Sequence, residues 1–586
     1  MATVRRLTEA NLTDQQKRVI TEPGDLVVVG RPGCGKTSVA LLKALRFLNE
    51  AEDEDARVLF LSFSNAAVQR IQVAARLVTI PRPIQRRFEV TTFHAFCHHV
   101  LSSHARLAGM PRLGGIVLRN EQNMLKVESA DPKGELARLE REEGRCSFER
   151  LIEQTVDIFR RNKVLRAAYA KAYPLILVDE YQDTNDIQDE LIDLLGHPGQ
   201  VIYLGDPDQR IYDFVPGVRP DRVDRRLDRA GVTRVELEQL SHRSGGADLV
   251  AYGRAVLTSC SLTRKSKSVT VFQYGKAASF SKKLRQAIMC AETAVRRLSP
   301  SPEPPSVAIL GYRNVFVARL SAELNLVNGG FQFPFAHRVH AGADEVGPAW
   351  SFLFALLGIP KTGDACDVLS AAIHQYGRFE RTQKGSGHEK TAAALLTAAE
   401  GYRQKKKIPA RSLAGLDTQL ETVSKSFRGD PRKDIESLVA VLRANGSAHL
   451  AGVLASLCLR SPADAGPDLI LKLAESYSEN GYYRDSLPMA EASLLRERLL
   501  ENEDIGKGRL ITTLHKVKGK EFDAVVIVDG PGDGDKLLLR NDQSQDKSRR
   551  LLNVAITRAR HHVAILTPVY DPCCLLPVVP ADATSS

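Results

Sequence analysis

The stretch Leu26-Val27-Val28-Val29-Gly30-Arg31-Pro32-Gly33-Cys34-Gly35-Lys36-Thr37 decides the fold. It begins as an apolar, β-branched run, and its end has the form G-x-x-x-x-G-K-T. Leucines at helical spacing follow, at Leu41, Leu42, Leu45 and Leu48. This order predicts a strand, a phosphate-binding loop and a helix, with backbone N–H groups turned toward a β-phosphate. A glycine-rich turn without a ligand is the alternative, and the flanking strand and helix make it the poorer explanation.

The composition is that of a folded chain with more than one domain. Of its 586 residues, 43% are hydrophobic and 26% are charged, and its nine cysteines form no C-x-x-C pair. The 81 basic residues exceed the 70 acidic ones and give a formal charge of +11, which favours a polyanionic partner. No apolar run approaches the roughly eighteen residues of a membrane span, and the first residues contain no apolar signal segment. We therefore expect a cytoplasmic protein that does not enter a membrane.

A second apolar run, Tyr173-Pro174-Leu175-Ile176-Leu177-Val178, is followed by the carboxylates Asp179 and Glu180. A phosphate loop needs such a partner, because Mg²⁺ bridges the phosphates and is held in part by a carboxylate at a strand end. The sequence therefore predicts Mg²⁺ binding by Thr37 and Asp179. Glu180 is placed to orient or deprotonate the attacking water. A strand that ends in two solvated acids is the alternative.

Other strand-like runs alternate with helical segments, which is the rhythm of a parallel α/β sheet. They end at polar turns, in Phe60-Leu61-Ser62-Phe63-Ser64-Asn65, in Val90-Thr91-Thr92-Phe93-His94 and in Leu204-Gly205-Asp206-Pro207-Asp208-Gln209. Open α/β sheets bind their ligands at the carboxyl ends of the strands. The sequence therefore predicts that these turns lie at the ligand-binding edge of the sheet.

Two long stretches carry a family resemblance: Val178-Asp179-Glu180-Tyr181-Gln182-Asp183-Thr184-Asn185 and Gly205-Asp206-Pro207-Asp208-Gln209-Arg210-Ile211-Tyr212. They resemble motifs II and III of the UvrD/Rep/PcrA helicases of superfamily 1A. Further pieces follow in that family's order: a Q-motif around Gln16, the phosphate loop, 62–65, 91–94, 240–244 (motif IV), 512–522 (motif V) and 549–560 (motif VI). The resemblance spans nearly the whole chain.

The resemblance implies that the ligands are ATP and Mg²⁺. Gln16 would bind the adenine edge, Gln209 would sense the γ-phosphate, and Glu521 would meet the ribose. Arg243 and Arg558 would be arginine fingers from the second motor domain; for either one alone, a surface salt bridge is the alternative. The predicted ATP site is Gln16, Gly30, Arg31, Pro32, Gly33, Cys34, Gly35, Lys36, Thr37, Ser38 and Glu521. The predicted catalytic groups are Lys36, Asp179, Glu180, Gln209, Arg243 and Arg558.

The resemblance also implies a path for single-stranded DNA. Phe214 would stack on a base, which is a sequence-tolerant contact, and a core position is its alternative. Contacts to the DNA backbone would come from Thr92 and His94 and from their counterparts Thr513 and His515. The predicted nucleic-acid set is Ser64, Asn65, Thr92, His94, Tyr212, Phe214, Thr513 and His515.

The chain departs from the family pattern at four places. Ser38 stands where an arginine is common, and His242 where a tyrosine is usual, so stacking on the base of ATP is expected to be weaker and nucleotide selectivity stays open. The stretch Val215-Pro216-Gly217 replaces a frequent Arg-Gly-Ala, and Asn553 replaces a common tyrosine. DNA is therefore favoured over RNA without being fixed by the residues.

The expected fold class is α/β, with two RecA-like motor domains that have parallel sheets and that each carry a mainly helical insertion. The first motor domain would comprise 1–100 and 173–236, with an insertion over 101–172. The second would comprise 237–344 and 502–570, with an insertion over 345–501, followed by a short tail over 571–586.

Three functions are compatible with these motifs. The first is an ATP-dependent DNA helicase or translocase, moving 3′ to 5′ on single-stranded DNA and acting on partly duplex DNA in repair, recombination or defence. The second is a DNA-stimulated ATPase subunit that serves a separate effector nuclease in an anti-phage system. The third, opposed by motifs III and VI, is an NTP-binding protein unrelated to nucleic acid.

Overall fold

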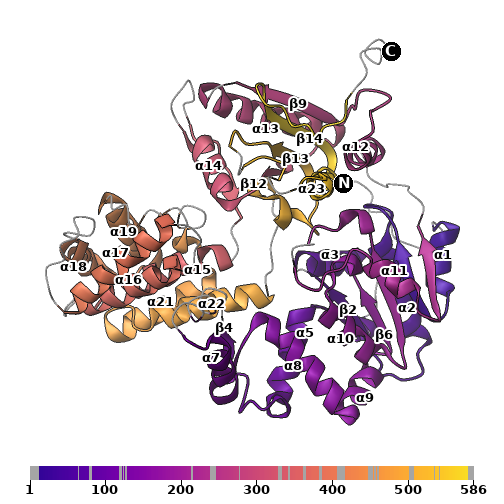
Figure 1. Cartoon of the computed structure of the whole chain (residues 1–586), viewed down its shortest axis with the longest axis horizontal. Helices are drawn as coiled ribbons and strands as arrows, with labels where there is room; N and C mark the ends of the chain where they lie inside the picture. Colours follow the sequence, from indigo (N-terminus) through magenta and orange to yellow (C-terminus); the bar gives the residue numbers. More distant parts are fainter. Residues whose placement is uncertain are drawn as a thin grey trace. The chain divides into compact units, whose positions relative to one another are not determined.

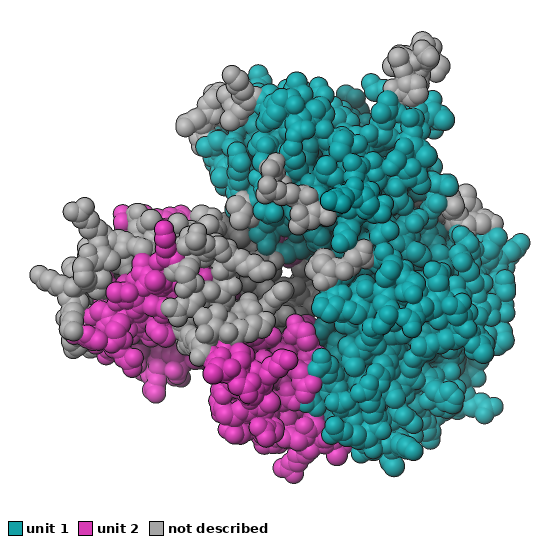
Figure 2. All heavy atoms as spheres, viewed as in Figure 1, with its two compact units in different colours: residues 1–99, 152–339, 502–586 teal, residues 100–151, 340–501 magenta. Residues whose placement is uncertain are grey.

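The computed structural model describes most of the chain. The described residues are 12–63, 65–77, 82–117, 122, 125, 129–212, 215–237, 246–275, 277–326, 333–340, 343–360, 365–381, 386–404, 416–445, 450, 453–454, 457, 461–500, 507–532, 535–539 and 542–578. The chain divides into two compact units, coloured in Figure 2. Unit 1 comprises 1–99, 152–339 and 502–586, and unit 2 comprises 100–151 and 340–501.

Unit 1 contains two six-stranded sheets in which every pairing is parallel, as the α/β fold class predicts (Figure 1). The first has the strand order β3-β2-β6-β7-β1-β8. Its strands are β1 (Asp25–Val29), β2 (Val58–Ser62), β3 (Phe88–Thr92), β6 (Leu175–Val178), β7 (Gln200–Gly205) and β8 (Val232–Glu236). Its main helices are α1 (Asp14–Thr21), α2 (Lys36–Glu50), α3 (Asn65–Leu77), α5 (Phe93–His104), α8 (Phe148–Arg161), α9 (Lys163–Ala172), α10 (Asp186–Gly196) and α11 (Arg222–Leu227).

The second sheet has the order β11-β12-β10-β13-β14-β9. Its strands are β9 (Val269–Tyr274), β10 (Ser306–Gly311), β11 (Arg338–Val339), β12 (Gly508–Thr513), β13 (Phe522–Val528) and β14 (Ala559–Pro568). Its helices are α12 (Gly246–Thr258), α13 (Ala277–Leu298), α14 (Asn314–Asn325) and α23 (Asp546–Ile556). The sheet is therefore assembled from two segments that are far apart in the sequence.

Burial explains why these strands form where the apolar runs occur. Parallel strands with both faces covered read as continuous apolar stretches, and β6 and the last four residues of β1 are fully buried. Alternate residues of these two strands join one core with Phe60, Leu41 and Leu204, namely Leu26, Val28, Leu175 and Leu177. The helix predicted just before the phosphate loop is α1, and its capping box is made by Thr13 and Gln16.

Unit 2 is mainly helical. Residues 340–501 supply α15 (Ala343–Leu357), α16 (Ala365–Arg381), α17 (Ser386–Arg403), α18 (Leu416–Ser426), α19 (Pro431–Asn445), α21 (Pro467–Asn480) and α22 (Ser486–Leu500). They pack around a core that includes Trp350, Phe354 and Leu438. In the described part of 345–501 every regular element is a helix, as predicted.

The segment 101–151 contains a small parallel sheet that the sequence did not predict. The strands β4 (Gly115–Val117) and β5 (Arg145–Ser147) pair Ile116 with Cys146, near the helix α7 (Pro132–Arg138). Strands of three residues are too short to show a periodic pattern, which is why only helix was expected here. None of the helices in the described ranges has the length and apolar character that a membrane crossing requires.

Candidate ATP and nucleic-acid site

The phosphate loop connects β1 to α2 as a tight backbone cradle. Gly33 and Gly35 have φ angles of 84° and 89°, in the left-handed region that favours glycine. A Cβ atom added to Gly30 would lie 2.5 Å from the Sγ atom of Cys34. The Cys34 side chain thus fills the place that a Gly30 side chain would need, and glycine at these three positions allows the tight backbone turn of a phosphate-binding loop.

Lys36 begins α2 and is turned back over this loop. Its Nζ donates to the carbonyl oxygens of Gly30 and Arg31, the second at 3.3 Å. Thr37 and Ser38 lie half-buried in the first turn of the same helix. The ammonium charge and the N-terminal end of the α2 dipole therefore act on the same small volume, where negative charge is stabilised.

The Gln16 amide is already engaged by the chain. Its Nε2 donates to the Cys34 carbonyl oxygen at 3.1 Å, and its Oε1 accepts from the Thr13 backbone nitrogen at 3.1 Å. The first contact ties α1 to the phosphate loop, which places Gln16 beside the nucleotide cradle.

Asp179 and Glu180 follow β6 directly. Asp179 is 4% exposed, and its backbone nitrogen donates to Leu61 of the neighbouring strand at 2.9 Å. Glu180 has φ 53° and ψ 40°, a conformation that costs a residue with a side chain about 1–3 kcal/mol. Gln182 holds the Glu180 carboxylate through an Nε2 to Oε2 contact of 2.6 Å, while its own Oε1 accepts from the Asp206 nitrogen at 2.9 Å.

The donor set fits Mg²⁺ together with a nucleotide. Within the described residues there is no group of three or more histidine, cysteine or acidic side chains that could hold a metal alone. Mg²⁺ does not need one, because it is usually bound by one or two protein oxygens, by phosphate oxygens and by water. The Thr37 hydroxyl and the Asp179 carboxylate are of this kind, and a bound Mg²⁺ would neutralise charge on the β- and γ-phosphates.

Gln209 brings together groups from both sheets of unit 1. It ends the short 3-10 helix η5 (Pro207–Gln209) and is 3% exposed. Its Nε2 donates to Asp206 Oδ2 at 2.6 Å, and its Oε1 accepts from Nη2 of Arg558. Arg558 lies between α23 and β14, is also 3% exposed, and donates through Nε to the Val554 carbonyl at 3.2 Å. Two residues 349 positions apart therefore meet at one buried contact.

Lys518 is a second buried cation at this place, and the sequence prediction gave it no role. Its Nζ donates to Asp183 Oδ2 and, at 2.6 Å, to the Gln209 carbonyl oxygen. It also lies 3.8 Å from Glu180 Oε2 and 5.4 Å from the centre of the Tyr212 ring. Lys518 stands between Lys516 and Lys520 in a basic stretch, so nothing in the residue pattern distinguished it.

Two of the residues predicted for DNA contact, Thr92 and Thr513, are the last residues of strands. Thr92 ends β3, and its Oγ1 accepts from the Ala95 nitrogen at 3.2 Å, with His94 in the first turn of α5. Thr513 ends β12, and burial lowers the pKa of the following His515, whose ring lies 5.8 Å from Tyr312. Tyr212 packs on Phe63, with ring centres 4.7 Å apart.

Other predicted residues are placed differently or are not described. Glu521 accepts from Nε of Arg560 at 3.4 Å, so the residue assigned to the ribose is engaged by an arginine. Ser64, Phe214, Arg243 and the whole 240–244 stretch lie outside the described residues. Asn65 begins α3, and its side chain also lies outside the described part.

Comparison with protein families matches parts of both sheets of unit 1. Residues 12–139 and 118–218 match the UvrD/REP helicase N-terminal domain, and residues 510–566 match the UvrD-like helicase C-terminal domain. In these regions the chain is similar to the UvrD-like helicases, the family that its motifs predicted. The matched regions contain the phosphate loop, Asp179, Glu180, Gln209, Lys518 and Arg558.

The named relatives are DNA helicases. The chain is 28% identical over 301 residues to the ATP-dependent DNA helicase UvrD1 of Mycobacterium leprae, covering 40% of this chain and 38% of that protein. It is 25% identical over 276 residues to DNA helicase II of Haemophilus influenzae, covering 39% and 38%. It is 25% identical over 249 residues to the ATP-dependent DNA helicase PcrA of Staphylococcus epidermidis, covering 34% of each. The chain thus spans well under half the length of the curated relatives it matches.

The first prediction separates the roles of Lys36 and Glu180. Lys36→Ala removes positive charge from the phosphate cradle, so ATP affinity is expected to fall by about tenfold or more, and hydrolysis with it. Glu180→Gln leaves the cradle intact, so hydrolysis is expected to be lost while ATP stays bound. Titration with a fluorescent ATP analogue and a steady-state ATPase assay measure both effects. Lys17→Ala, at an exposed position of α1, is the control, and equal loss of ATP affinity in both variants would contradict the role given to Glu180.

The second prediction concerns pH. Burial raises the pKa of Asp183 to about 6, against the opposing charge of Lys518. Asp183 is therefore ionised above about pH 6 and becomes neutral as the pH falls, which removes the ion pair with Lys518. The ATPase rate is expected to decline from about pH 7 to about pH 5 in the wild type. The Asp183→Asn variant should hydrolyse ATP slowly at both pH values and should lack this decline. If its rate still declines between about pH 7 and about pH 5 as in the wild type, the titrating group is another residue.

Proposed function

We propose that the chain is an ATP-dependent DNA helicase or translocase that hydrolyses ATP on single-stranded DNA and moves 3′ to 5′. The observation that carries the proposal is the contact of Arg558 and Lys518, from the second sheet, with Gln209, Asp183 and Glu180, from the first. Cations that must arrive from a second domain make hydrolysis depend on closure, and closure is a movement that a motor can use.

The proposed chemistry assigns a role to each group. Lys36 and the loop amides hold the β- and γ-phosphates, with Mg²⁺ on Thr37 and Asp179, and Glu180 positions the attacking water. Gln209 senses the γ-phosphate, and Arg558 meets the charge that develops on its oxygens, a role worth roughly 10³-fold or more in rate for such arginines. Arg243 as the second finger, Gln16 at the adenine and Glu521 at the ribose remain part of the proposal.

The substrate side of the proposal rests on three supports. The relatives named above are DNA helicases, and the chain carries a formal charge of +11. In addition, two strands in unit 1 end in a threonine that is followed two residues later by a histidine. We infer that single-stranded DNA runs along these strand ends, with Phe214 or Tyr212 as the stacking aromatic. The division into two motor domains with insertions over 101–172 and 345–501, and a cytoplasmic location, belong to the same proposal.

The third prediction tests this function. The ATPase rate of the wild type is expected to rise about tenfold or more with single-stranded DNA, and a duplex with a 3′ tail should be unwound in preference to one with a 5′ tail. Lys36→Ala is the inactive control. DNA binding should weaken steeply with salt, because phosphate contacts release counterions.

Other results of these assays would point to a different function. Stimulated ATPase without displacement on any tailed duplex would favour a DNA-triggered motor subunit for a separate effector nuclease. Stimulation of the ATPase rate by RNA and not by DNA would identify RNA as the substrate. An ATPase that ignores nucleic acid would contradict the proposal.

A further inference from the structure

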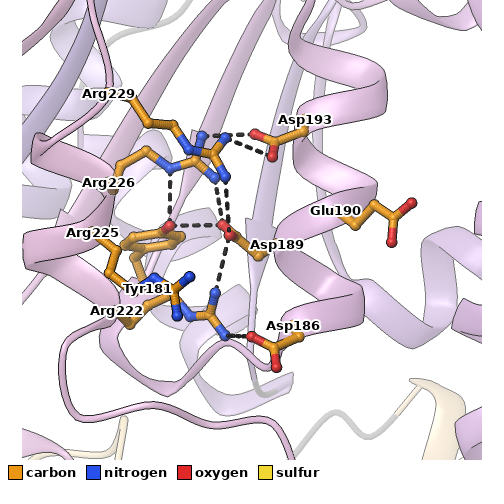
Figure 3. Close-up of a pocket in the computed structure, with 9 residues that line it drawn as sticks. All are labelled: Tyr181, Asp186, Asp189, Glu190, Asp193, Arg222, Arg225, Arg226 and Arg229. Carbon is orange, nitrogen blue, oxygen red and sulfur yellow. Dashed lines mark hydrogen bonds and ion pairs between the residues drawn. The ribbon is translucent and has the colours of Figure 1, made fainter.

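A cluster of arginines and acids surrounds a cavity of about 310 Å³ in the first half of unit 1 (Figure 3). The arginines come from α11 and its flanks, and the acids come from α10. The members that matter here are Tyr181, Asp186, Asp189, Asp193, Arg222 and Arg226.

The charges of the cluster are paired with one another. Arg222 donates to Asp189 at 3.0 Å and to Asp186 at 2.7 Å, and Arg226 donates to Asp193 at 2.6 Å and also to Asp189. Both arginines are buried, with 5% and 3% of their surface exposed. The carboxylates already occupy the places beside Arg222 and Arg226 that an anion would take, so the cavity is not built to bind an anion.

The cluster reaches the residue that follows Glu180. Tyr181 is 1% exposed, and its hydroxyl donates to Asp189 at 2.7 Å and accepts from Nε of Arg226 at 3.0 Å. In Figure 3 the Tyr181 hydroxyl points at Asp189 and Arg226, between α10 and the arginines. The side chain next to the proposed water-orienting group is therefore fixed at its far end.

Arg226 also contacts the strand that leads to Gln209. Its guanidinium carbon lies 4.5 Å from the centre of the Tyr203 ring, and the rings of Tyr181 and Tyr203 are 4.6 Å apart. Tyr203 belongs to β7, where it pairs with Val178, and β7 continues into Asp206 and Gln209. One buried guanidinium thus packs against the residue that follows Glu180 and against the strand that leads to Gln209.

The backbone of Glu180 explains why such an anchor is needed. A φ of 53° is uncommon for a residue with a side chain and persists only where the surroundings hold it. On one side β6 holds the chain, and on the other side Tyr181 is the first residue after the turn. If the Tyr181 ring shifted, the turn would relax and the Glu180 carboxylate would move.

We propose that Arg226 and Asp189 are positioning residues for ATP hydrolysis, which act by clamping the Tyr181 hydroxyl and so fixing the Glu180 turn. This inference rests on the proposed function, because it requires Glu180 to orient the attacking water. A displacement of about 1 Å at such a group lowers the rate by about 100-fold. The loss of rate is expected in the chemical step and not in ATP binding, since the phosphate loop proposed to bind ATP is not part of the clamp.

The test compares Tyr181→Phe and Arg226→Lys with a matched control. Tyr181→Phe removes one hydroxyl, and Arg226→Lys keeps the charge but loses the forked donor. The control is Arg229→Ala, which removes an exposed arginine of the same cluster. Arg229 pairs with Asp193 at 2.6 Å and lies 3.7 Å from the Asp189 oxygen that does not accept from Tyr181. For all four proteins kcat and KM for ATP are measured with and without single-stranded DNA, at a temperature well below the thermal midpoint of each.

The expected result is a fall in kcat of about tenfold or more in Tyr181→Phe and in Arg226→Lys, with KM for ATP within about twofold of the wild type. Arg229→Ala should keep kcat within about twofold. If both clamp variants keep their kcat and only lose thermal stability, or if Arg229→Ala slows hydrolysis as much as they do, the proposal is overturned. Should Arg226→Lys fail to fold, Tyr181→Phe decides.

The same data separate this inference from the proposed function. A wild type that hydrolyses ATP without stimulation by DNA contradicts the DNA motor, while the comparison of the variant rates still tests the clamp. A wild type that hydrolyses no ATP overturns both.

Discussion

The buried ammonium group of Lys518 is the constraint on which the proposed site depends. A buried cation is costly unless it is paired and hydrogen-bonded, and Lys518 meets this requirement through Asp183, the Gln209 carbonyl and the more distant Glu180 carboxylate. Those partners belong to the first sheet, whereas Lys518 follows β12 of the second. Arg558 is also a buried cation, and it donates a hydrogen bond to the Gln209 side chain. The two sheets are thus joined where the γ-phosphate of ATP is proposed to lie, so changes at a bound nucleotide can reach both sheets of unit 1.

Parallel topology explains why three strands are enough to bring the groups of the candidate nucleotide site together. The carboxyl ends of β1, β6 and β7 meet at one edge of the sheet, and they deliver the phosphate loop, the Asp179–Glu180 pair and the Asp206–Gln209 turn. The left-handed backbone at Glu180 and the proposed clamp on Tyr181 then fix the position of the Glu180 carboxylate. ATP binding and ATP hydrolysis are proposed to depend on different contacts, so single substitutions are expected to affect one without the other.

The sequence predicted whatever is local in the chain. The phosphate loop, the apolar strands and the α/β class follow from glycine spacing and continuous apolar runs, and the long helical segment of unit 2 follows from its periodicity. Lys518 and Arg226 were not found, because their partners lie far away: Asp183 is 335 residues from Lys518, and Asp189 is 37 residues from Arg226. A basic stretch usually marks a solvated face, and here it contains buried side chains. The strands β4 and β5 were missed because three residues carry no period.

The central claim is that Arg558 and Gln209 act as one unit across the two sheets, and a double-mutant cycle on the rate of ATP hydrolysis tests it most directly. The rates of DNA-stimulated hydrolysis are measured for the wild type, Gln209→Ala, Arg558→Ala and the double variant. The account predicts that the double variant is no more than about threefold slower than the slower single variant, because groups that act together lose their effect together. Two losses that multiply in the double variant would show that the residues act independently, and would contradict the account.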